Sequence, residues 1–400
     1  MECKRAVLIG HNFNSILGLA RALGAEGYEV SVLRTGVYLG RNFLLRLGQT
    51  PEKSSKYIAK HIQVMTKDAD RILRVLKEEL ASPEVKSVLI PVDDVCAELI
   101  DGHMEELRPF YYMPNVNDTQ GGVTRLMDKY TQKLLAKEAG LPVPDGCSVK
   151  IENGQFTIPD DVHYPCFAKS ETPMPRRKGY MGKCEDREEL RALLERAAAY
   201  RDCVMLVDEY VPISREYCVV GLCGHEGVMI PEVIDEQILG HGEHAGVTCF
   251  GRVLPADAFD ADFLDRLRVF LRSTGFVGLF TVDVFQSGEK LFFGELNLRI
   301  GGSGVAVMAA GVDLATMAAD TLRGCESIDE TAQCREMTFA SERPLLNDRI
   351  TGYIDRKEYQ RLLRSADCRF LDAKDDRGPV RSFRWQIARE YARHLAQRLK

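Results

Sequence analysis

The sequence has no hydrophobic run long enough to cross a membrane, although 45% of its 400 residues are hydrophobic. A membrane-spanning helix needs about 20 consecutive, predominantly apolar residues. The first ten residues, MECKRAVLIG, hold only a short apolar segment before the polar residues His11 and Asn12, unlike a secretory signal. We therefore expect a cytoplasmic protein without a membrane span, and its length predicts two or three domains.

Paired cysteine motifs are also absent, although the chain contains 12 cysteines. The two that lie closest in sequence, Cys218 and Cys223, do not form a CxxC motif. Structural zinc sites and disulfide frameworks usually show paired or regular cysteine spacing. The cysteines are therefore interpreted as buried single thiols.

The excess of negative charge is small, and the C-terminal part has the opposite sign. Residues 343–400 hold 15 lysines and arginines against 8 aspartates and glutamates, a net charge of +7, whereas the whole chain carries −6. Acidic residues interrupt the basic ones, so we interpret this region as a solvated surface and expect no nucleic-acid partner. The end of the chain predicts a basic amphipathic helix with one apolar stripe for packing, formed by Trp385, Ala388, Ala392, Leu395 and Leu399.

The glycine-rich fingerprint of dinucleotide-binding domains is missing as well. Residues 5–36 read as a strand, a polar turn, a helix and a second strand, which is a βαβ unit. With the further apolar strand in VKSVLIPVDD, residues 1–113 predict a small Rossmann-like, doubly wound domain. The first turn, residues 10–14, is GHNFN and lacks the GxGxxG pattern. This argues against a nicotinamide-dependent oxidoreductase and favours a structural or substrate-contacting role for the turn.

The pattern of predicted elements changes at Asp128. The segment DKYTQKLLAKEAGLPVPDG predicts a helix and then a linker near residues 145–160. The strand in YPCFAKS carries Lys169 near its end, and the loop from Arg176 to Lys183 is rich in basic residues. Its glycines, Gly179 and Gly182, make it flexible enough to fold over phosphates.

Polar side chains recur on the strands that follow. Glu209 ends the strand VMLVDEYV, and Glu216 lies seven residues later on what we expect to be an adjacent strand. The segments GLFTVDVFQSG and EKLFFGELNLR, joined by a turn at Ser287–Gly288, predict an antiparallel hairpin.

The second strand of this hairpin carries polar residues at every second position. Glu295, Asn297 and Arg299 therefore project from one face, while Leu296, Leu298 and Ile300 pack behind them. Asp283 lies on the first strand. Its carboxylate, with the oxygens of Glu295 and Asn297, suits a hard cation such as Mg²⁺, which commonly takes one or two carboxylates and leaves its other positions to phosphates and water.

Taken in order, these features resemble the ATP-grasp superfamily over roughly residues 115–315, and specifically its carboxylate-amine ligases. The spacing of Glu209 and Glu216 is similar to that in D-alanine:D-alanine ligases. Arg299 is similar to an arginine in the carbamoyl-phosphate-synthetase branch, and the segment NFNSILGLARALG is similar to one in amino-acid and D-aspartate ligases.

The resemblance implies a site for ATP and Mg²⁺, with Mn²⁺ as an alternative ion. It implies phosphate contacts from Lys129 and Lys169, a lid with Gly179 and Gly182, adenine contacts from Glu209, Tyr210 and Val211, ribose binding by Glu216, and metal binding by Asp283, Glu295 and Asn297. Lys169 and Arg299 are then the catalytic candidates. His244 is a candidate for contact with nucleotide or substrate, but the acidic residue expected soon after it is missing, so a locally bonded loop histidine stays open.

The implied fold is α/β, with an α+β grasp region. Its divisions are a pre-ATP-grasp domain at 1–113, an ATP-grasp domain at 114–325 with a lid subdomain at about 145–212, and a basic C-terminal extension at 326–400. Ser170 departs from the family pattern, in which a proline usually follows the second lysine.

The implied reaction is ATP-dependent formation of an amide or peptide bond through an acylphosphate, with release of ADP and phosphate. The substrates would be a small-molecule carboxylate and an amine, both resembling amino acids, and a homodimer stays open as the assembly. Two other functions also stay open: a catalytically silent ATP-binding module, and a carboxylating enzyme of the carbamoyl-phosphate-synthetase kind.

Overall fold

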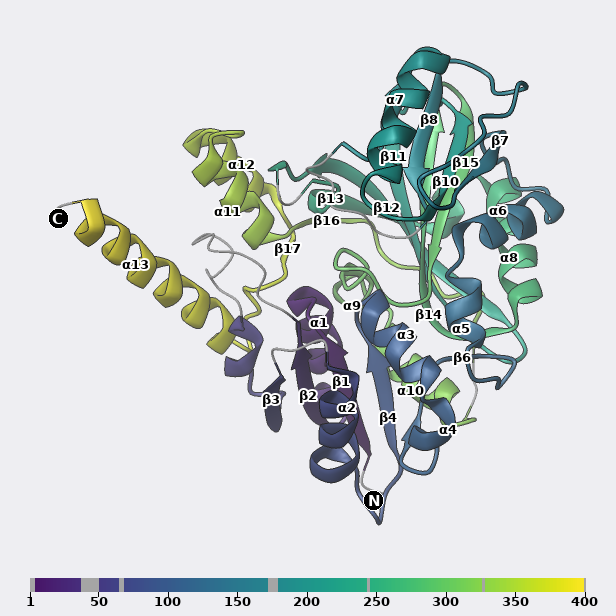
Figure 1. Ribbon diagram of the computed structural model, residues 1–400. Coiled ribbons are helices and arrows are strands. Elements are labelled where there is room, and N and C mark those ends of the chain that lie inside the picture. The colour runs from purple at the N-terminus through teal and green to yellow at the C-terminus, as the bar shows by residue number, and fades with distance from the viewer. Residues whose placement is uncertain are drawn as a thin grey trace.

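Three β-sheets organise the part of the chain that the structure describes (Figure 1). A computed structural model of the 400-residue protein describes residues 4–36, 50–64, 68–171, 179–242, 245–325 and 328–398. A parallel sheet lies at the bottom of Figure 1, a small antiparallel sheet lies at the top with α7, and a large sheet connects the two regions. In these ranges, no helix is both long enough and apolar enough to span a bilayer.

The N-terminal sheet has five parallel strands in the order β3-β2-β1-β4-β5. This confirms the predicted Rossmann-like arrangement. Residues 6–9 are all buried, and alternate residues enter two different hydrophobic clusters, because helices cover both faces of a parallel sheet. The elements of this region are β1 (Arg5–Gly10), α1 (Phe13–Ala25), β2 (Glu29–Thr35), η2 (Pro51–Ser54), β3 (Lys60–Val64), α2 (Ala69–Val75), η3 (Leu76–Leu80), β4 (Ser87–Pro91), α3 (Asp94–Gly102), α4 (Met104–Leu107) and β5 (Tyr111–Tyr112).

The smallest sheet has four antiparallel strands in the order β7-β10-β8-β9, and α7 packs on it. The predicted linker near residues 145–160 is wrong in part, because its first half forms β7. Val149 and Ile151 alternate with exposed residues and pack with Leu190 and Leu194 of α7. The elements are β7 (Gly146–Ile151), β8 (Cys166–Ser170), β9 (Gly182–Cys184), α7 (Arg187–Ala198) and β10 (Cys203–Glu209).

The largest sheet has the order β15-β14-β11-β12-β13-β16-β17, and β6 also pairs with β14. The predicted hairpin is confirmed as β14–β15. The expectation that Glu209 and Glu216 lie on adjacent strands is wrong, because β10 and β11 belong to different sheets. The strands are β6 (Asn115–Val116), β11 (Arg215–Cys223), β12 (Val228–Leu239), β13 (Thr248–Pro255), β14 (Phe276–Ser287), β15 (Lys290–Asn297), β16 (Met337–Ala340) and β17 (Cys368–Arg369).

Helices join the large sheet to the N-terminal sheet. Both α1 and α10 lie between them, since α1 contacts β1 and α10 contacts α1, β11 and β14. One hydrophobic cluster therefore runs from Leu8 through Leu19 to Val220. The helices of this region are α5 (Gly122–Leu126), α6 (Lys129–Glu138), η6 (Ala256–Ala258), α8 (Ala261–Thr274), α9 (Ala306–Ala309) and α10 (Leu314–Leu322).

The C-terminal region contains α11 (Glu342–Thr351), α12 (Arg356–Ser365) and the long helix α13 (Gly378–Arg398), which extends away to the left in Figure 1. The predicted packing stripe of α13 is wrong at Trp385 and Ala388. Trp385 is 61% exposed and Ala388 is also exposed. The first turns of α13 face α1 with different residues. Val380 and Phe383 pack against Phe13 and Leu17 of α1. Ala392, Leu395 and Leu399 fall where side chains are not described.

The cysteines largely follow the prediction of single thiols. The 11 cysteines in the described ranges are all free, and most are buried. The prediction of buried thiols fails for four of them: Cys147, Cys203 and Cys368 are half-buried, and Cys325 is exposed after the end of α10.

Candidate active site

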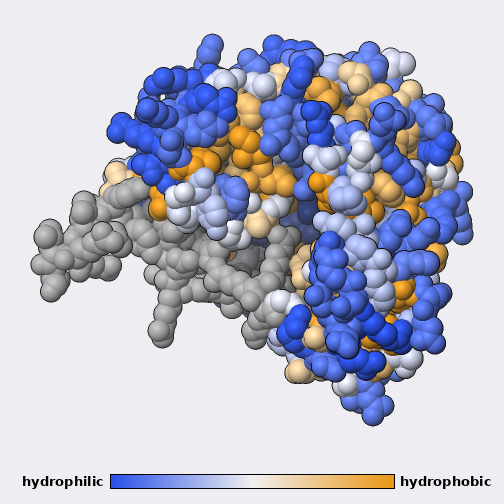
Figure 2. Space-filling model, turned by 90° about the horizontal axis from the view of Figure 1, so that it is seen from above, coloured by the Kyte–Doolittle hydropathy of each residue, from blue (hydrophilic) through white to orange (hydrophobic). Residues whose placement is uncertain are grey.

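A cavity of about 680 Å³ opens between the turn after β1 and the β14–β15 hairpin. Seen from above, a hollow near the middle of the molecule is bordered by hydrophobic residues, and most of the remaining surface on this face is hydrophilic (Figure 2). Segments far apart in sequence form the cavity wall. They are the turn at 11–14, the start of α3, strands β11 and β12, the hairpin, the turn at 301–303 and the start of α11.

Most of the charged residues singled out in the sequence meet at this cavity. Its lining includes Lys169, Glu216, Asp283, Glu295, Asn297 and Arg299. Lys129 joins them through an ion pair, with its Nζ 2.9 Å from Glu295 Oε2. These seven residues thus come together from the strands of the β14–β15 hairpin and β11, the segment just after β15, the end of β8 and the first turn of α6.

Other predicted site residues lie outside the cavity lining. Glu209 accepts a hydrogen bond at Oε1 from the backbone N–H of Asp145, at 3.2 Å. The Lys183 ammonium lies 4.5 Å from the ring centre of Tyr210. Gly179, Gly182 and Val211 also do not contribute to this wall. His244, and residues 176–178 of the predicted lid, fall outside the described residues.

A β-bulge sets the positions of the two hairpin carboxylates. Asp283 pairs with Glu295 while the next residue, Val284, pairs with Phe293, so Gly294 is the extra residue. A Cβ atom at Gly294 would lie 2.6 Å from Phe285 Cε1 and 2.8 Å from the carbonyl oxygen of Asp283. Only glycine fits this kink without a shift in its neighbours. The bulge therefore places both carboxylates opposite each other at the cavity.

These carboxylates form a region of concentrated negative charge. Burial, followed by the nearby Glu295 and Glu236, raises the pKa of Asp283 to about 7, and Arg299 and Asn297 oppose this shift. The Asp283 side chain is nevertheless open to the cavity, so water moderates the shift. Burial likewise raises the pKa of Glu236 to about 7 and also raises that of Glu216. A cation at this place would relieve the repulsion.

The donor set fits Mg²⁺ better than it fits a metal enclosed wholly by protein. No group of three His, Cys, Asp or Glu side chains in the described ranges could hold a metal alone. Asp283 and Glu295 supply two carboxylates, and the Asn297 amide lies beside Asp283, with its Nδ2 3.5 Å from Asp283 Oδ2. Two carboxylates and an amide leave room for the phosphate and water ligands that Mg²⁺ usually keeps.

Arg299 is fixed by two parallel hydrogen bonds. Its Nε donates to Asp94 Oδ1 at 2.8 Å, and its Nη2 donates to Asp94 Oδ2 at 3.1 Å. Nη2 also lies 3.3 Å from Asn297 Oδ1. This bidentate pairing holds the guanidinium plane in one orientation at the cavity.

The comparisons with known proteins identify this part of the chain. Residues 134–312 match the family model of the ATP-grasp domain. The chain contains an ATP-grasp domain. The resemblance found in the sequence is therefore confirmed, and so is the α/β fold class.

Two curated relatives extend the match beyond the ATP-grasp domain. The chain is 26% identical over 190 residues to N5-carboxyaminoimidazole ribonucleotide synthase of Synechococcus elongatus, which covers 46% of this chain and 45% of that protein. It is 24% identical over 275 residues to D-aspartate ligase of Enterococcus faecium, with 62% and 61% covered. The matches thus span less than two thirds of either relative's own length.

A solved structure shares the fold over most of the chain. The structure of N5-carboxyaminoimidazole synthetase from Staphylococcus aureus covers 88% of this chain, and this chain covers 87% of it, with a TM-score of 0.61. The sequence identity is 16%, so this likeness concerns the fold alone.

The lysines near the cavity have different surroundings. Burial, and then the neighbouring Lys129, lower the pKa of Lys169, whereas Asp208 and Glu295 act in the opposite direction. Lys133, one helical turn after Lys129, forms an ion pair with Asp208 of β10. This pair joins α6 to the four-stranded sheet.

Three residues of the site were missed in the sequence. Asp94, Glu236 and Arg343 all line the cavity, and the Arg343 guanidinium lies 5.5 Å from the ring centre of Phe13. The sequence could have predicted Asp94, because it lies shortly after a buried parallel strand, where the polar residues of α/β folds often gather. No local pattern in the sequence predicts Glu236 or Arg343, since the positions of these residues depend on pairings with distant segments.

Proposed function

We propose that the protein is an ATP-dependent ligase that joins a carboxylate to an amine and releases ADP and phosphate. The observation that carries this proposal is the meeting of Lys169, the Lys129–Glu295 ion pair and the Asp283–Asn297 pair at one cavity that Arg299 also lines. The lysine ammonium groups can bind phosphate oxygens, and the carboxylate and amide oxygens can bind a metal ion. The ATP-grasp family of the domain supports the same reading.

In this proposal, the triphosphate of ATP lies between the two lysines and the hairpin. Lys129 and Lys169 bind its oxygens, Glu216 binds the ribose, and residues 209–211 meet the adenine. Gly179 and Gly182 belong to the lid that covers the phosphates. Mg²⁺ or Mn²⁺ held by Asp283, Glu295 and Asn297 would neutralise phosphate charge.

The chemical step has two parts. A carboxylate oxygen of the first substrate attacks the γ-phosphorus, and the bond from that phosphorus to the β,γ-bridging oxygen breaks, which leaves ADP and an acylphosphate. The amine then attacks the carbonyl carbon, and phosphate leaves with the former carboxylate oxygen. Lys169 stabilises the transferring group, and Arg299, held by Asp94, stabilises the oxyanion together with backbone N–H groups of residues 301–304.

The substrates we propose are amino-acid-like. The similarity to a D-aspartate ligase supports this class. Arg343 offers a positive charge on the wall formed by α11, where it would face a substrate carboxylate.

The position of α11 is held by a contact with the large sheet. His241 lies on the loop after β12, and its Nδ1 is 2.9 Å from Asp348 Oδ2 of α11.

Hydroxylamine trapping tests this function. The protein is incubated with MgATP, hydroxylamine and single amino acids or other carboxylates, and hydroxamate, ADP and phosphate are measured. We expect one acid to yield all three in equal amounts, and we expect Arg299→Ala to lower hydroxamate more than it weakens ATP binding. Release of AMP and pyrophosphate would instead establish adenylation. If no acid yields ADP while MgATP binds, the silent ATP-binding module is correct.

A second candidate is carboxylation of an amine, in which bicarbonate is the acid that is phosphorylated. The similarity to an N5-carboxyaminoimidazole ribonucleotide synthase supports it. ATP hydrolysis measured in buffer freed of carbon dioxide separates the two candidates. Hydrolysis that depends on added bicarbonate, and on no other acid, would favour carboxylation over ligation of an organic acid.

A further inference from the structure

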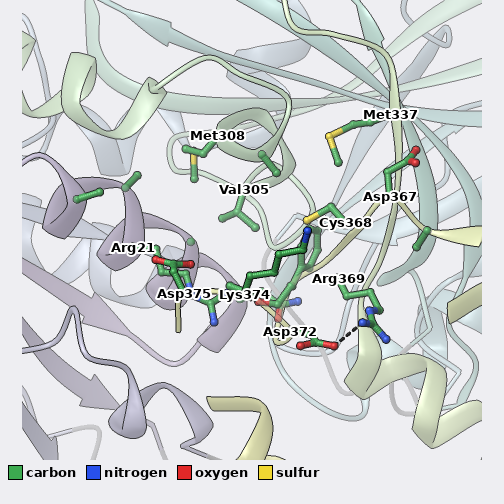
Figure 3. A pocket seen from close by; sticks show the side chains of 18 of the residues that line it. Arg21, Val305, Met308, Met337, Asp367, Cys368, Arg369, Asp372, Lys374 and Asp375 are labelled. Carbon is green, nitrogen blue, oxygen red and sulfur yellow. Dashed lines mark hydrogen bonds and ion pairs between the residues drawn. The ribbon is translucent and has the colours of Figure 1, made fainter. Parts of the chain in front are cut away.

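A second cavity, of about 890 Å³, opens beside helix α1 (Figure 3). Helix α1, the segment around α9, the start of β16, the end of α12 and residues 366–377 surround it. Among the described residues, Asn14 alone lines both cavities, and its Nδ2 donates to Ser341 Oγ at 2.9 Å in a buried hydrogen bond. Because the two linings otherwise consist of different described residues, the second cavity is a distinct space.

One side of the second cavity is apolar. Val305 and Met337 belong to one hydrophobic cluster, against which Met308 packs. Figure 3 shows Val305 beside Met308, and Met337 farther along the cavity next to Asp367. Gly18 and Ala22 add the facing surface of α1, where a Cβ atom at Gly18 would lie 2.6 Å from Val305 Cβ. Methionine side chains adapt to ligands of varied shape, and a wall of this kind suits the apolar part of a small molecule.

The acidic residues of the lining are nearly all engaged by neighbouring groups, two of them in ion pairs and two in hydrogen bonds with neutral donors. Asp372 forms ion pairs with both Arg369 and Arg377. Asp367 accepts hydrogen bonds from Thr338 N and Oγ1, both at 2.9 Å. Two more acids are engaged as well: Asp375 with Tyr57 and Lys56, and Asp313 with the backbone N–H of Thr316. Glu26, exposed at the rim, is the one acid of this lining without such a contact in the described ranges.

Basic residues of the lining keep their charge available. Within the described ranges, Lys374 and Arg364 form neither an ion pair nor a side-chain hydrogen bond, and both are exposed. Arg335 donates only to a carbonyl oxygen, that of Ala309, at 2.9 Å. The whole lining holds six basic residues against five acidic ones, so its net charge is +1, and the two cations without a partner in the described ranges lie beside an apolar wall.

We propose that this cavity is a second ligand site, which takes a small organic anion with an apolar body. Lys374 and Arg364 meet the anionic group, and the wall of Val305, Met308 and Met337 covers the apolar body. The site is distinct from the nucleotide and substrate cavity because the two linings share only Asn14 among the described residues. The proposal therefore does not depend on the proposed reaction.

Binding of anilinonaphthalene sulfonate, a fluorescent aromatic anion, tests the proposal on the full chain. We expect saturable binding of one equivalent that persists when MgADP is present. Lys374→Glu and Arg364→Glu should each weaken binding by about fivefold, because each replaces an attraction by a repulsion at a partly exposed place. Ala22→Phe should weaken binding to a similar degree by filling the space without a change in charge.

Lys357→Glu is the matched control, because Lys357 is exposed on α12 but does not line the cavity. It should leave the affinity within about twofold of the unaltered protein. Thermal unfolding identifies any variant that fails to fold, and Lys374→Ala replaces Lys374→Glu in that case. Equal affinities in all four variants, or displacement of the dye by MgADP, would overturn the proposal.

Discussion

Two carboxylates that face each other across the β14–β15 hairpin decide whether the proposed metal site exists. We predict that Asp283→Asn and Glu295→Gln each lower ATP-dependent phosphate release by at least about a hundredfold, because each removes a negative ligand from the metal. Both variants should fold, since like charges opposite each other on neighbouring strands are destabilising. Steady-state assays over a range of Mg²⁺ concentrations measure the effect.

Glu289→Gln is the control for the hairpin variants, because Glu289 is exposed in the turn of the same hairpin. It should keep normal turnover. Near-normal rates of Asp283→Asn and Glu295→Gln at saturating Mg²⁺ would mean that these carboxylates are only part of a solvated surface.

The residues of the site differ in how far the sequence could predict them. Glu295, Asn297 and Arg299 share one face because strand side chains alternate, and this period is visible in a single segment. Glu236 and Arg343 reach the same cavity through pairings of β12 and the packing of α11, which depend on contacts between distant segments. The functional roles of all these residues stay predictions until variants are measured.

A buried carboxyl away from the cavity gives a prediction about stability. Glu232 on β12 has no exposed surface, and neither of its carboxylate oxygens has a hydrogen-bond partner. Burial raises its pKa well above the usual range. The Cys334 thiol donates instead to the carbonyl oxygen of Val307, at 3.8 Å. The folded protein therefore keeps a proton on Glu232 at pH values where the unfolded chain has lost it.

The free energy of unfolding should consequently fall as pH rises above about 4.3, by up to about 1.4 kcal/mol per pH unit from this group. We predict that Glu232→Gln removes this contribution, so that the variant gains stability over the unaltered protein between pH 5 and pH 8. Urea unfolding at several pH values measures the difference. Asp283 and Glu236 titrate in both proteins, so their contributions cancel in the comparison.

Glu195→Gln provides the comparison for Glu232→Gln, because Glu195 is exposed on α7. Its stability should follow that of the unaltered protein at every pH. A parallel pH dependence for Glu232→Gln and Glu195→Gln would contradict the assignment of a neutral, buried Glu232.

At the scale of single elements, the bulge in β15 is the feature on which the site most depends. We predict that Gly294→Ala lowers the free energy of unfolding by about 1–3 kcal/mol, because its Cβ would overlap Phe285 and the Asp283 carbonyl oxygen. The same shift should displace Glu295 and lower ATP-dependent turnover. Chemical denaturation and turnover assays on one preparation measure both effects.

Gly102→Ala is the matched glycine control, because a Cβ atom there meets nothing within 4 Å and Gly102, at the end of α3, does not line the cavity. It should retain its stability. If Gly294→Ala is as stable and active as Gly102→Ala, the bulge has no role in positioning the carboxylates.

Elements were predicted well where one local pattern decides them. The hairpin shows alternating polar residues and a turn, and both strands form as expected. Strand β7 was missed because Gly140, Pro142 and Pro144 indicate the end of a helix and a linker after it, although Val149 and Ile151 show strand alternation. The buried face of α13 was predicted wrongly, because several apolar stripes fit the sequence of this helix. The packing of Phe383 on α1 decides which of these faces is buried.

At the scale of the whole molecule, the sequence predicted several domains but not how the C-terminal region attaches. The structure adds β16 and β17 from this region to the large sheet and lays residues 370–376 against α1. Basic composition indicated a solvated surface, and it gave no sign of these attachments. The proposed boundaries at 113 and 325 stay predictions, because contacts between regions, rather than composition, define domains.

One buried aspartate connects three separate segments of the molecule. Asp376 Oδ2 accepts from Arg21 Nε of α1 at 2.9 Å and from Ser55 Oγ at 2.7 Å, and its Oδ1 accepts from the backbone N–H of Lys56 at 3.1 Å. Its side chain is almost completely buried. Arg21 also donates to the carbonyl oxygens of Phe370 and Leu371, at 2.6 and 3.1 Å. The C-terminal segment is thereby tied to the N-terminal region.

We predict that Asp376→Ala lowers the free energy of unfolding by about 3 kcal/mol, since it leaves Arg21 without its acidic partner in a mostly buried place. Hydrogen exchange should rise in residues 366–378 and 50–56, while the center of the large sheet keeps its protection, because the lost contacts lie at this junction alone. Asp375→Ala is the neighbouring control: Asp375 is exposed, its ion pair with Lys56 is a surface pair, and its loss should cost less than about 1 kcal/mol. Equal losses of stability in the two variants would mean that the C-terminal segment is held by its apolar contacts with α1, through Leu371, Val380 and Phe383, and that the Asp376 connection is dispensable.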